Sequence, residues 1–184
     1  MTKKSLYEKL KNVKLVAMDV DGTYTDGLLF YDSQGGVIKG FHAHDGLALE
    51  LLRLINVKRG FITGRIDNAT TARAEYLKVD FFMNNISDKR SALKKVLGDF
   101  GFSEEECVYI GDDLNDLSAF DTSVIGIAVA NADPAIKKVA DYVTKTEGGK
   151  GAIREVVNMI LESRNLNPVD VWKTGSGIVG PGKQ

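Results

Sequence analysis

Two aspartates, Asp19 and Asp21, stand two residues apart directly after an apolar run. That run, residues 13–18, predicts a buried strand, and Gly22 and Thr23 end it. In an open α/β sheet, chemistry gathers at the carboxyl ends of strands. Because side chains alternate along an extended backbone, both carboxylates are expected to point the same way. Two like charges that close need a divalent cation between them, or one of the two carboxyls must be protonated.

Apolar periodicity predicts the elements that position these carboxylates. Strands are expected at residues 60–65, 79–83, 107–110, 124–129 and 141–144, and helices at 5–11, 68–77, 87–100 and 152–162. Two more helices are expected to begin at Asp45, placed as an N-cap, and at Asp133. Strands that alternate with helices of this length indicate βαβ units. The fold class is therefore α/β, with a doubly wound, mostly parallel sheet flanked by helices.

Residues 27–41 depart from this alternation. Leu28–Tyr31 and Val37–Phe41 are two β-type runs, and the segment between them holds two glycines. This pattern predicts a β-hairpin. A hairpin so apolar is marginally stable alone, so we expect it to cover another surface or to pair with a second copy.

Other polar residues follow the ends of the expected strands. They are Thr63, then Asp112, Asp113 and Asp116, with Lys89 near the start of a helix. Because the carboxyl ends of parallel strands share one edge of the sheet, we expect these groups to converge on Asp19 and Asp21.

This set of residues suits phosphoryl transfer. A carboxylate nucleophile needs an electrophile that tolerates an anion, and a phosphoryl group qualifies once a metal neutralises its charge. Asp19 is the expected nucleophile, which forms an aspartyl-phosphate, and Asp21 is the expected general acid and base. Mg²⁺ prefers oxygen ligands and keeps several waters, and its expected ligands are Asp19, Asp21 and Asp112.

The remaining polar residues have supporting roles in this interpretation. Thr63 and Lys89 would hold the phosphoryl oxygens, while Asp113 and Asp116 would orient the metal ligands. Each also has an ordinary structural interpretation. Thr63, Asp113 and Asp116 could be helix caps, and Lys89 could be one more solvated lysine.

Composition limits the class of protein further. The chain has 184 residues, of which 43% are hydrophobic and 27% charged, as in one globular domain. Its formal net charge of -1 gives no footprint for nucleic acid. The sequence has no apolar run long enough to predict a transmembrane helix. The single cysteine, Cys107, excludes an intrachain disulfide and fits a reducing compartment, so we expect a cytoplasmic protein.

Four segments together resemble the motifs of the haloacid dehalogenase (HAD) phosphohydrolase superfamily. They are Asp19–Thr23, Thr63 after its strand, Lys89 before its helix and Gly111–Asp116. Their order and spacing match over nearly the whole chain. The resemblance implies a Rossmann-like HAD core and agrees with the phosphatase chemistry inferred from the residues.

Further segments resemble the 3-deoxy-D-manno-octulosonate 8-phosphate (KDO 8-phosphate) phosphatases within that superfamily. They are Thr25–Gly27, the hairpin in place of a cap domain, Phe41–Gly46, Ile62–Arg65 and Glu147–Glu155. This similarity implies hydrolysis of KDO 8-phosphate to KDO and phosphate in lipopolysaccharide precursor synthesis. It also implies a homotetramer, in which the hairpins build a central β-barrel and neighbouring subunits close each active site.

The resemblance also implies which residues contact the sugar acid. They are Asp45, Gly64, Arg65 and Lys150. Arg65 would clamp the substrate carboxylate, whereas residues 148–151 are either an anion-binding turn or a flexible connector. His44 and Lys150 depart from residues common in the family, and Lys and Arg grip a carboxylate differently.

Alternative functions therefore stay open at this point. The substrate could instead be a nine-carbon 2-keto-3-deoxy sugar acid 9-phosphate or another small sugar phosphate. From a different class, the chain could be a non-catalytic assembly subunit, although such a subunit is expected to have lost the motif carboxylates.

The C-terminal segment differs in composition from the rest. Residues 1–166 are expected to form a single HAD-like domain, and residues 167–184 a tail rich in Gly and Pro that contains Trp172. Such a composition is typical of disorder. Our hypothesis is that the tail packs on a neighbouring subunit, at the mouth of its active site.

Overall fold

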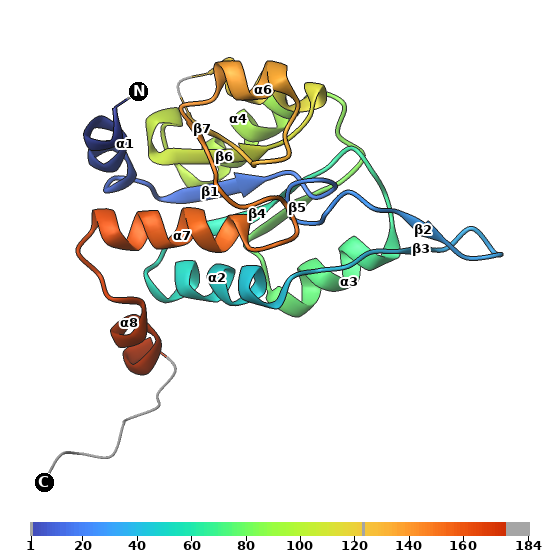
Figure 1. The fold of residues 1–184 in the computed structure, drawn as a ribbon, viewed down its shortest axis with the longest axis horizontal. Coiled ribbons are helices and arrows are strands. Elements are labelled where there is room, and N and C mark those ends of the chain that lie inside the picture. The colour runs from blue at the N-terminus through green and yellow to red at the C-terminus, as the bar shows by residue number, and fades with distance from the viewer. Residues whose placement is uncertain (1, 123, 176–184) are drawn as a thin grey trace, which may run out of the picture.

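A six-stranded parallel sheet forms the centre of the computed structural model, which describes residues 2–122 and 124–175 (Figure 1). Its strand order is β5-β4-β1-β6-β7-β8, and every pairing in it is parallel. The strands are β1 (Leu15–Met18), β4 (Lys58–Ile62), β5 (Phe81–Met83), β6 (Cys107–Gly111), β7 (Ile125–Ala128) and β8 (Tyr142–Val143). The expected doubly wound α/β fold is confirmed.

Helices cover both faces of this sheet (Figure 1). One face carries α1 (Lys3–Leu10), α2 (Ala43–Leu54), α3 (Asn68–Leu77) and α7 (Ala152–Ser163). The other carries α4 (Lys89–Phe100) and α6 (Pro134–Val139), and α5 (Leu117–Phe120) packs against α4. Two short 3-10 helices, η1 (Glu104–Glu106) and η2 (Leu114–Asp116), flank β6. Because both faces are covered, the central strands are apolar without alternation, as the sequence of β1 is.

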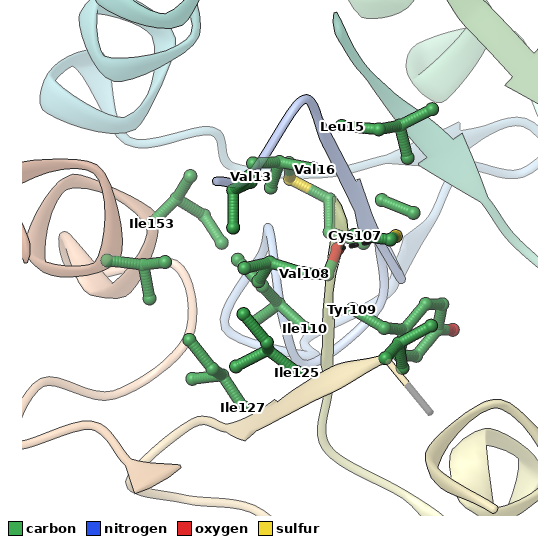
Figure 2. Packing of buried hydrophobic residues seen from close by; sticks show 14 of the residues in the cluster. Val13, Leu15, Val16, Cys107, Val108, Tyr109, Ile110, Ile125, Ile127 and Ile153 are labelled. Carbon is green, nitrogen blue, oxygen red and sulfur yellow. Dashed lines mark hydrogen bonds between the residues drawn. The ribbon is translucent and has the colours of Figure 1, made fainter. Parts of the chain in front are cut away.

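Apolar side chains from the sheet and from α7 form the core (Figure 2). β1 supplies Leu15 and Val16, β6 supplies Val108 and Ile110, and α7 supplies Ile153. All five side chains are inaccessible to water. This packing fixes the strands relative to one another, and it therefore fixes the loops that leave their carboxyl ends.

The chain reverses its direction of travel across the sheet beside β1. From β1 it proceeds to β4 and β5 on one side, then crosses to β6, β7 and β8 on the other. In the register of β1 with β6, Met18 lies opposite Ile110. The loops after these two strands therefore leave the sheet side by side, at the switch point where such folds bind ligands.

The hairpin projects from the body of the molecule (Figure 1). Its strands β2 (Phe30–Tyr31) and β3 (Val37–Ile38) pair antiparallel, with Phe30 opposite Ile38. Leu28, Phe30, Tyr31 and Ile38 are each more than half exposed. The hairpin predicted from the sequence is confirmed, although its paired part is shorter than the predicted runs.

The prediction that Asp45 caps its own helix was wrong. α2 begins two residues earlier, with His42 as its N-cap residue. The carboxylate of Asp45 instead accepts hydrogen bonds from the backbone N–H groups of Gly151 (3.1 Å) and Arg154 (2.8 Å), at the start of α7. Asp45 therefore satisfies free amides of a different helix, to which it contributes a stabilising negative charge.

The tail contains a helix that sequence composition did not predict. α8 (Pro168–Gly175) packs against α2, where Gly175 approaches the side chain of Leu54, and Trp172 contacts the core. Contact with α2 supplies the burial that a short helix needs to be stable. Residues 176–184 lie outside the described part of the chain, so the hypothesis about a neighbouring subunit stays a prediction. Among the described residues, no helix is both long and apolar enough to cross a bilayer.

Replacing Asp45 by Ala is expected to lower the free energy of unfolding by about 1–3 kcal/mol, because two buried amides of α7 lose their acceptor. Urea denaturation followed by circular dichroism measures this change. The matched control is Asp99→Ala on α4, where the aspartate is exposed and pairs only with Lys95. Its effect is expected within about 0.5 kcal/mol. Equal effects of the two substitutions would contradict the capping role of Asp45.

Candidate active site

A cleft of about 450 Å³ opens at the carboxyl ends of β1, β4 and β6. Residues of three loops line it, from Asp19 to Leu29, from Thr63 to Arg65 and from Asp112 to Asn115, together with Asn131. The convergence expected from the strand ends is therefore present. The cleft lies at the edge of the sheet and includes the base of the hairpin segment.

Asp19 and Asp112 line this cleft, and the buried Asp116 and Lys89 lie directly beside them. Oxygens of Asp19, Asp112 and Asp116 all lie within 4.8 Å of one another. The Lys89 ammonium lies 2.9 Å from Asp19 Oδ1 and 2.6 Å from Asp116 Oδ1. Lys89 is completely buried, which excludes its interpretation as a solvated lysine. It begins α4, so the N-cap Asp88 and the helix that follows fix its position.

Asp116 accepts hydrogen bonds from four neighbouring groups and so fixes their positions. Its Oδ1 accepts from Lys89 and from the Tyr109 hydroxyl (2.6 Å), while its Oδ2 accepts from the backbone N–H groups of Asp112 (2.9 Å) and Asp113 (3.2 Å). With both oxygens engaged by donors, Asp116 fixes Lys89 and the loop after β6. Asp113 is exposed and accepts from the N–H of Leu114 at the start of η2. The predicted orienting role thus fits the contacts of Asp116 more closely than those of Asp113.

Asp112 is seated directly on the first loop. Gly22 has φ of +96°, and a Cβ atom there would lie 2.1 Å from Asp112 Oδ2. Only glycine permits this approach and this backbone conformation together. The Thr23 hydroxyl donates to Asp112 Oδ1 (2.7 Å). Thr23 belongs to the first motif, but the sequence did not predict this hydrogen bond.

The electrostatics of the cluster favour a cation between Asp19 and Asp112. Burial raises the pKa of Asp19 to about 6; Lys89 opposes this shift and Asp116 adds to it. Burial also raises the pKa of Asp112 to about 7. The hydrogen bond from Thr23 lowers this pKa, and repulsion by Asp19 raises it further. A single lysine thus leaves the carboxylates short of positive charge. Closely spaced oxygen donors of this kind fit a hard divalent cation.

Asp21 lies in the same cleft with different partners. Its Oδ1 is 2.7 Å from Lys39 Nζ and its Oδ2 is 3.4 Å from Arg65 Nε. β1 ends at Met18 and the chain turns, so strand alternation no longer dictates side-chain direction. Asp21 is not among the clustered carboxylates, and a metal contact of its side chain stays a prediction.

The loop after β4 also lines the cleft. Thr63 is buried, its hydroxyl accepts from the N–H of Arg65 (3.3 Å), and it lines the cleft together with Gly64. The Arg65 side chain is about half exposed at the rim. Thr63, Gly64 and Arg65 thus line the cleft, and their contacts with phosphoryl and sugar-acid oxygens stay predictions.

The remaining predicted substrate residues lie elsewhere in the chain. Asp45 is buried in α2 against the start of α7, and it does not line the cleft. Lys150 is exposed, pairs with Glu147 (2.9 Å) and is also outside the lining. Within one chain, neither side chain faces the candidate site.

The turn at residues 147–150 supports the first loop from behind. A Cβ atom on Gly148 would lie 1.9 Å from the carbonyl oxygen of Gly22, so the two backbones are in direct contact. Asn131 joins them, because its amide donates to Gly22 O (3.1 Å) and accepts from Gly148 N–H (2.6 Å). The turn is therefore a packed support, which neither sequence interpretation had included.

Four polar residues that hold the site were not predicted to do so. They are Thr23, Lys39, Tyr109 and Asn131. Tyr109 contacts Asp116, seven residues along the chain, and the other three contact residues or backbone groups far away in the sequence, so no local pattern predicted those contacts. Their partners become evident only when the strands are in register.

Comparisons with known proteins agree with the fold and with the class of enzyme. A family profile described as haloacid dehalogenase-like hydrolase matches residues 58–156. The 3-deoxy-D-manno-octulosonate 8-phosphate phosphatase KdsC of Haemophilus influenzae is 37% identical, over 95% of this chain and 96% of that protein. The crystal structure of 3-deoxy-D-manno-octulosonate 8-phosphate phosphatase from Moraxella catarrhalis, in complex with magnesium ion, phosphate ion and KDO, has a TM-score of 0.85 and 39% identity. The aligned part covers 88% of this chain and 93% of the M. catarrhalis chain. A cobalt-bound deoxy-D-mannose-octulosonate 8-phosphate phosphatase of H. influenzae has a TM-score of 0.83 and 38% identity over 85% and 92% of the chains.

Replacing Asp112 by Asn is expected to stabilise the metal-free protein at alkaline pH. Because the pKa of Asp112 is raised to about 7 in the fold, its carboxyl stabilises the protein at acidic pH. That contribution is lost as the pH rises from the ordinary aspartate range through about 7. Asn cannot ionise, so the variant should lose less stability across this window.

Thermal unfolding at about pH 5 and about pH 8, with and without a divalent cation, measures the effect. The cation should raise the melting temperature of the wild type more than that of Asp112→Asn. The control is Asp113→Asn, an exposed aspartate in the same loop. A variant that follows the wild type at both pH values would contradict the electrostatic interpretation.

Proposed function

This chain belongs to the haloacid dehalogenase-like hydrolases, and we propose that it is a Mg²⁺-dependent phosphatase of KDO 8-phosphate. It releases KDO and phosphate, a step of lipopolysaccharide precursor synthesis. The observation that carries the proposal is that Asp19 and Asp112 line one cleft, with the buried Lys89 ammonium 2.9 Å from Asp19. The relative from M. catarrhalis that binds magnesium, phosphate and KDO gives the substrate class.

Asp19 is the nucleophile in this proposal. Its carboxylate oxygen attacks phosphorus in line with the leaving sugar oxygen, and an aspartyl-phosphate forms as the P–O bond to the sugar breaks. Lys89 lies 2.9 Å from that carboxylate and stabilises its negative charge before attack. Thr63 and Lys89 then hold the phosphoryl oxygens with hydrogen-bond donors set in advance by the fold. Mg²⁺, when bound by Asp19 and Asp112, supplies positive charge that neutralises the phosphoryl group.

Asp21 moves the protons. It gives a proton to the sugar alkoxide as that group leaves, and then takes a proton from the water that attacks the aspartyl-phosphate. Phosphate is released and the Asp19 carboxylate is restored. Asp21 suits this task because it lines the cleft outside the carboxylate cluster, where a leaving group can approach it.

The sugar acid is held at the rim. Arg65 and Gly64 line the open side of the cleft, and a guanidinium there can bind the substrate carboxylate with paired hydrogen bonds. In this proposal Asp45 and Lys150 make no direct contact from the same chain.

We further propose that residues 1–166 form one domain, which assembles as a homotetramer through the hairpin. The hairpin is small and apolar, and neighbouring subunits would cover it and narrow the open cleft, with the tail at a neighbouring site. A cytoplasmic location accords with the single cysteine, which is buried as a free thiol.

The substrate is tested by phosphate release from KDO 8-phosphate against nine-carbon sugar acid 9-phosphates and simple sugar phosphates, each with Mg²⁺. We expect the highest kcat/KM with KDO 8-phosphate. Asp19→Asn should reduce kcat by more than about a thousandfold with the fold retained, because the nucleophile is lost. Asp99→Asn, an exposed aspartate on α4, is the control. Faster turnover of a nine-carbon ester would show that the substrate is that ester and not KDO 8-phosphate. An active Asp19→Asn variant would show that Asp19 is not the nucleophile.

The assembly is tested by the double substitution Phe30→Ser and Ile38→Ser, which removes a facing apolar pair from the hairpin. Light scattering after size exclusion should report a tetramer for the wild type and a smaller species for the variant. Val139→Ser, an exposed position on α6, is the control. A variant that stays tetrameric would show that the hairpin is not the contact.

A further inference from the structure

Lys39 is the only buried residue between positions 26 and 40, all of which the structure describes. It follows β3 at the base of the hairpin, and its side chain has no exposed surface. Removing an ammonium group from water is costly unless opposite charges and hydrogen bonds replace the water. The surroundings of Lys39 therefore show what this buried charge does.

Three oxygens from two other segments surround the ammonium. Lys39 Nζ lies 2.7 Å from Asp21 Oδ1, 2.6 Å from Asp67 Oδ2 and 3.0 Å from Thr70 Oγ1. Lys39 thus joins the hairpin to the loop that carries Asp21 and to the start of α3. The group is balanced in charge, because Arg65 reaches the other oxygen of Asp21.

The two carboxylates depend on Lys39 to different degrees. Asp67 is the N-cap of α3 and accepts from the N–H (2.7 Å) and hydroxyl (3.0 Å) of Thr70. Asp21 Oδ1 is buried and has no hydrogen-bond partner among the described residues beyond its ion pair with Lys39. Its other oxygen meets only the half-exposed Arg65. The direction of the Asp21 carboxylate therefore rests mainly on Lys39.

Building on the phosphatase function proposed above, we propose that Lys39 is a positioning residue for the acid and base step. By engaging Oδ1 it leaves Oδ2, on the Arg65 side of the cleft, as the oxygen that carries the proton. That proton passes to the sugar oxygen as the P–O bond breaks and the Asp19–phosphorus bond forms. Without Lys39, Oδ1 loses the contact that holds it, so the carboxylate can rotate and Oδ2 no longer has a fixed direction.

Leaving groups of different basicity distinguish this role from simple structural support. The sugar oxygen of KDO 8-phosphate leaves as a strongly basic alkoxide and needs a proton, whereas nitrophenolate is a stable anion and leaves without one. The parameter kcat/KM reports the steps up to the first phosphoryl transfer, before water is activated. A misplaced Asp21 must therefore lower kcat/KM for the alkyl ester and spare the aryl ester.

The experiment compares kcat/KM for KDO 8-phosphate and p-nitrophenyl phosphate in the wild type, Lys39→Met and Asp21→Asn. For Lys39→Met we expect a fall of about tenfold or more with the sugar ester, and of less than about threefold with the aryl ester. Asp21→Asn should show the same selectivity and a larger loss. The matched control is Lys58→Met. Lys58 begins β4, at the end of the strand away from the cleft, and pairs with Asp80 (2.8 Å). This control should change neither value.

Several outcomes would overturn the inference. Equal loss on both esters, or no loss on either, in Lys39→Met removes the positioning role while leaving an active wild type and its proposed function intact. A wild type inactive on both esters removes the phosphatase function and this inference with it. Lys39→Gln is the second variant should Lys39→Met not fold, and loss of the folded state in both would make Lys39 a structural residue only.

Discussion

The candidate site depends on one buried ion pair network, in which Lys89 lies between Asp19 and Asp116. Although burial lowers the pKa of Lys89, the two carboxylates raise it above its ordinary value, so the lysine stays charged. Asp116 in turn holds Tyr109 and the loop after β6. Removing Lys89 would leave two buried carboxylates without their cation, which costs more than the ion pairs contribute. The network therefore keeps the nucleophile fixed and ionised at the bottom of the cleft.

Backbone contacts hold the rest of the site around this network. Gly22 receives the carboxylate of Asp112 on one side and the backbone of Gly148 on the other, and Asn131 bridges the first loop to that turn. These contacts are short and leave no space for side chains. The loops can therefore be irregular and still rigid, because the sheet and the supporting turn restrict them from both sides.

A second group of charges lies on the hairpin side of the same cleft. Lys39 and Arg65 contact Asp21, and Asp67 shares Lys39 with it, whereas Asp19 and Asp116 contact Lys89. The two aspartates of the first motif thus have distinct electrostatic surroundings, which is how neighbouring carboxyls come to have different chemical roles. This separation also ties the acid and base step to the base of the hairpin, the segment proposed to join the subunits.

The parallel sheet and the meeting of Asp19, Thr63, Lys89 and Asp112 were predictable from the sequence alone, because strand periodicity and polar strand ends are local signals. Only the tertiary structure decided the roles of Asp45 and Lys39. Asp45 belongs to α2, but its carboxylate caps α7, which begins more than a hundred residues later in the chain. Lys39 looks like an exposed hairpin lysine until α3 and the first loop enclose it. α8 likewise needed α2 beside it. The task of a polar side chain depends on what lies opposite it in space, and no spacing along the chain records that partner.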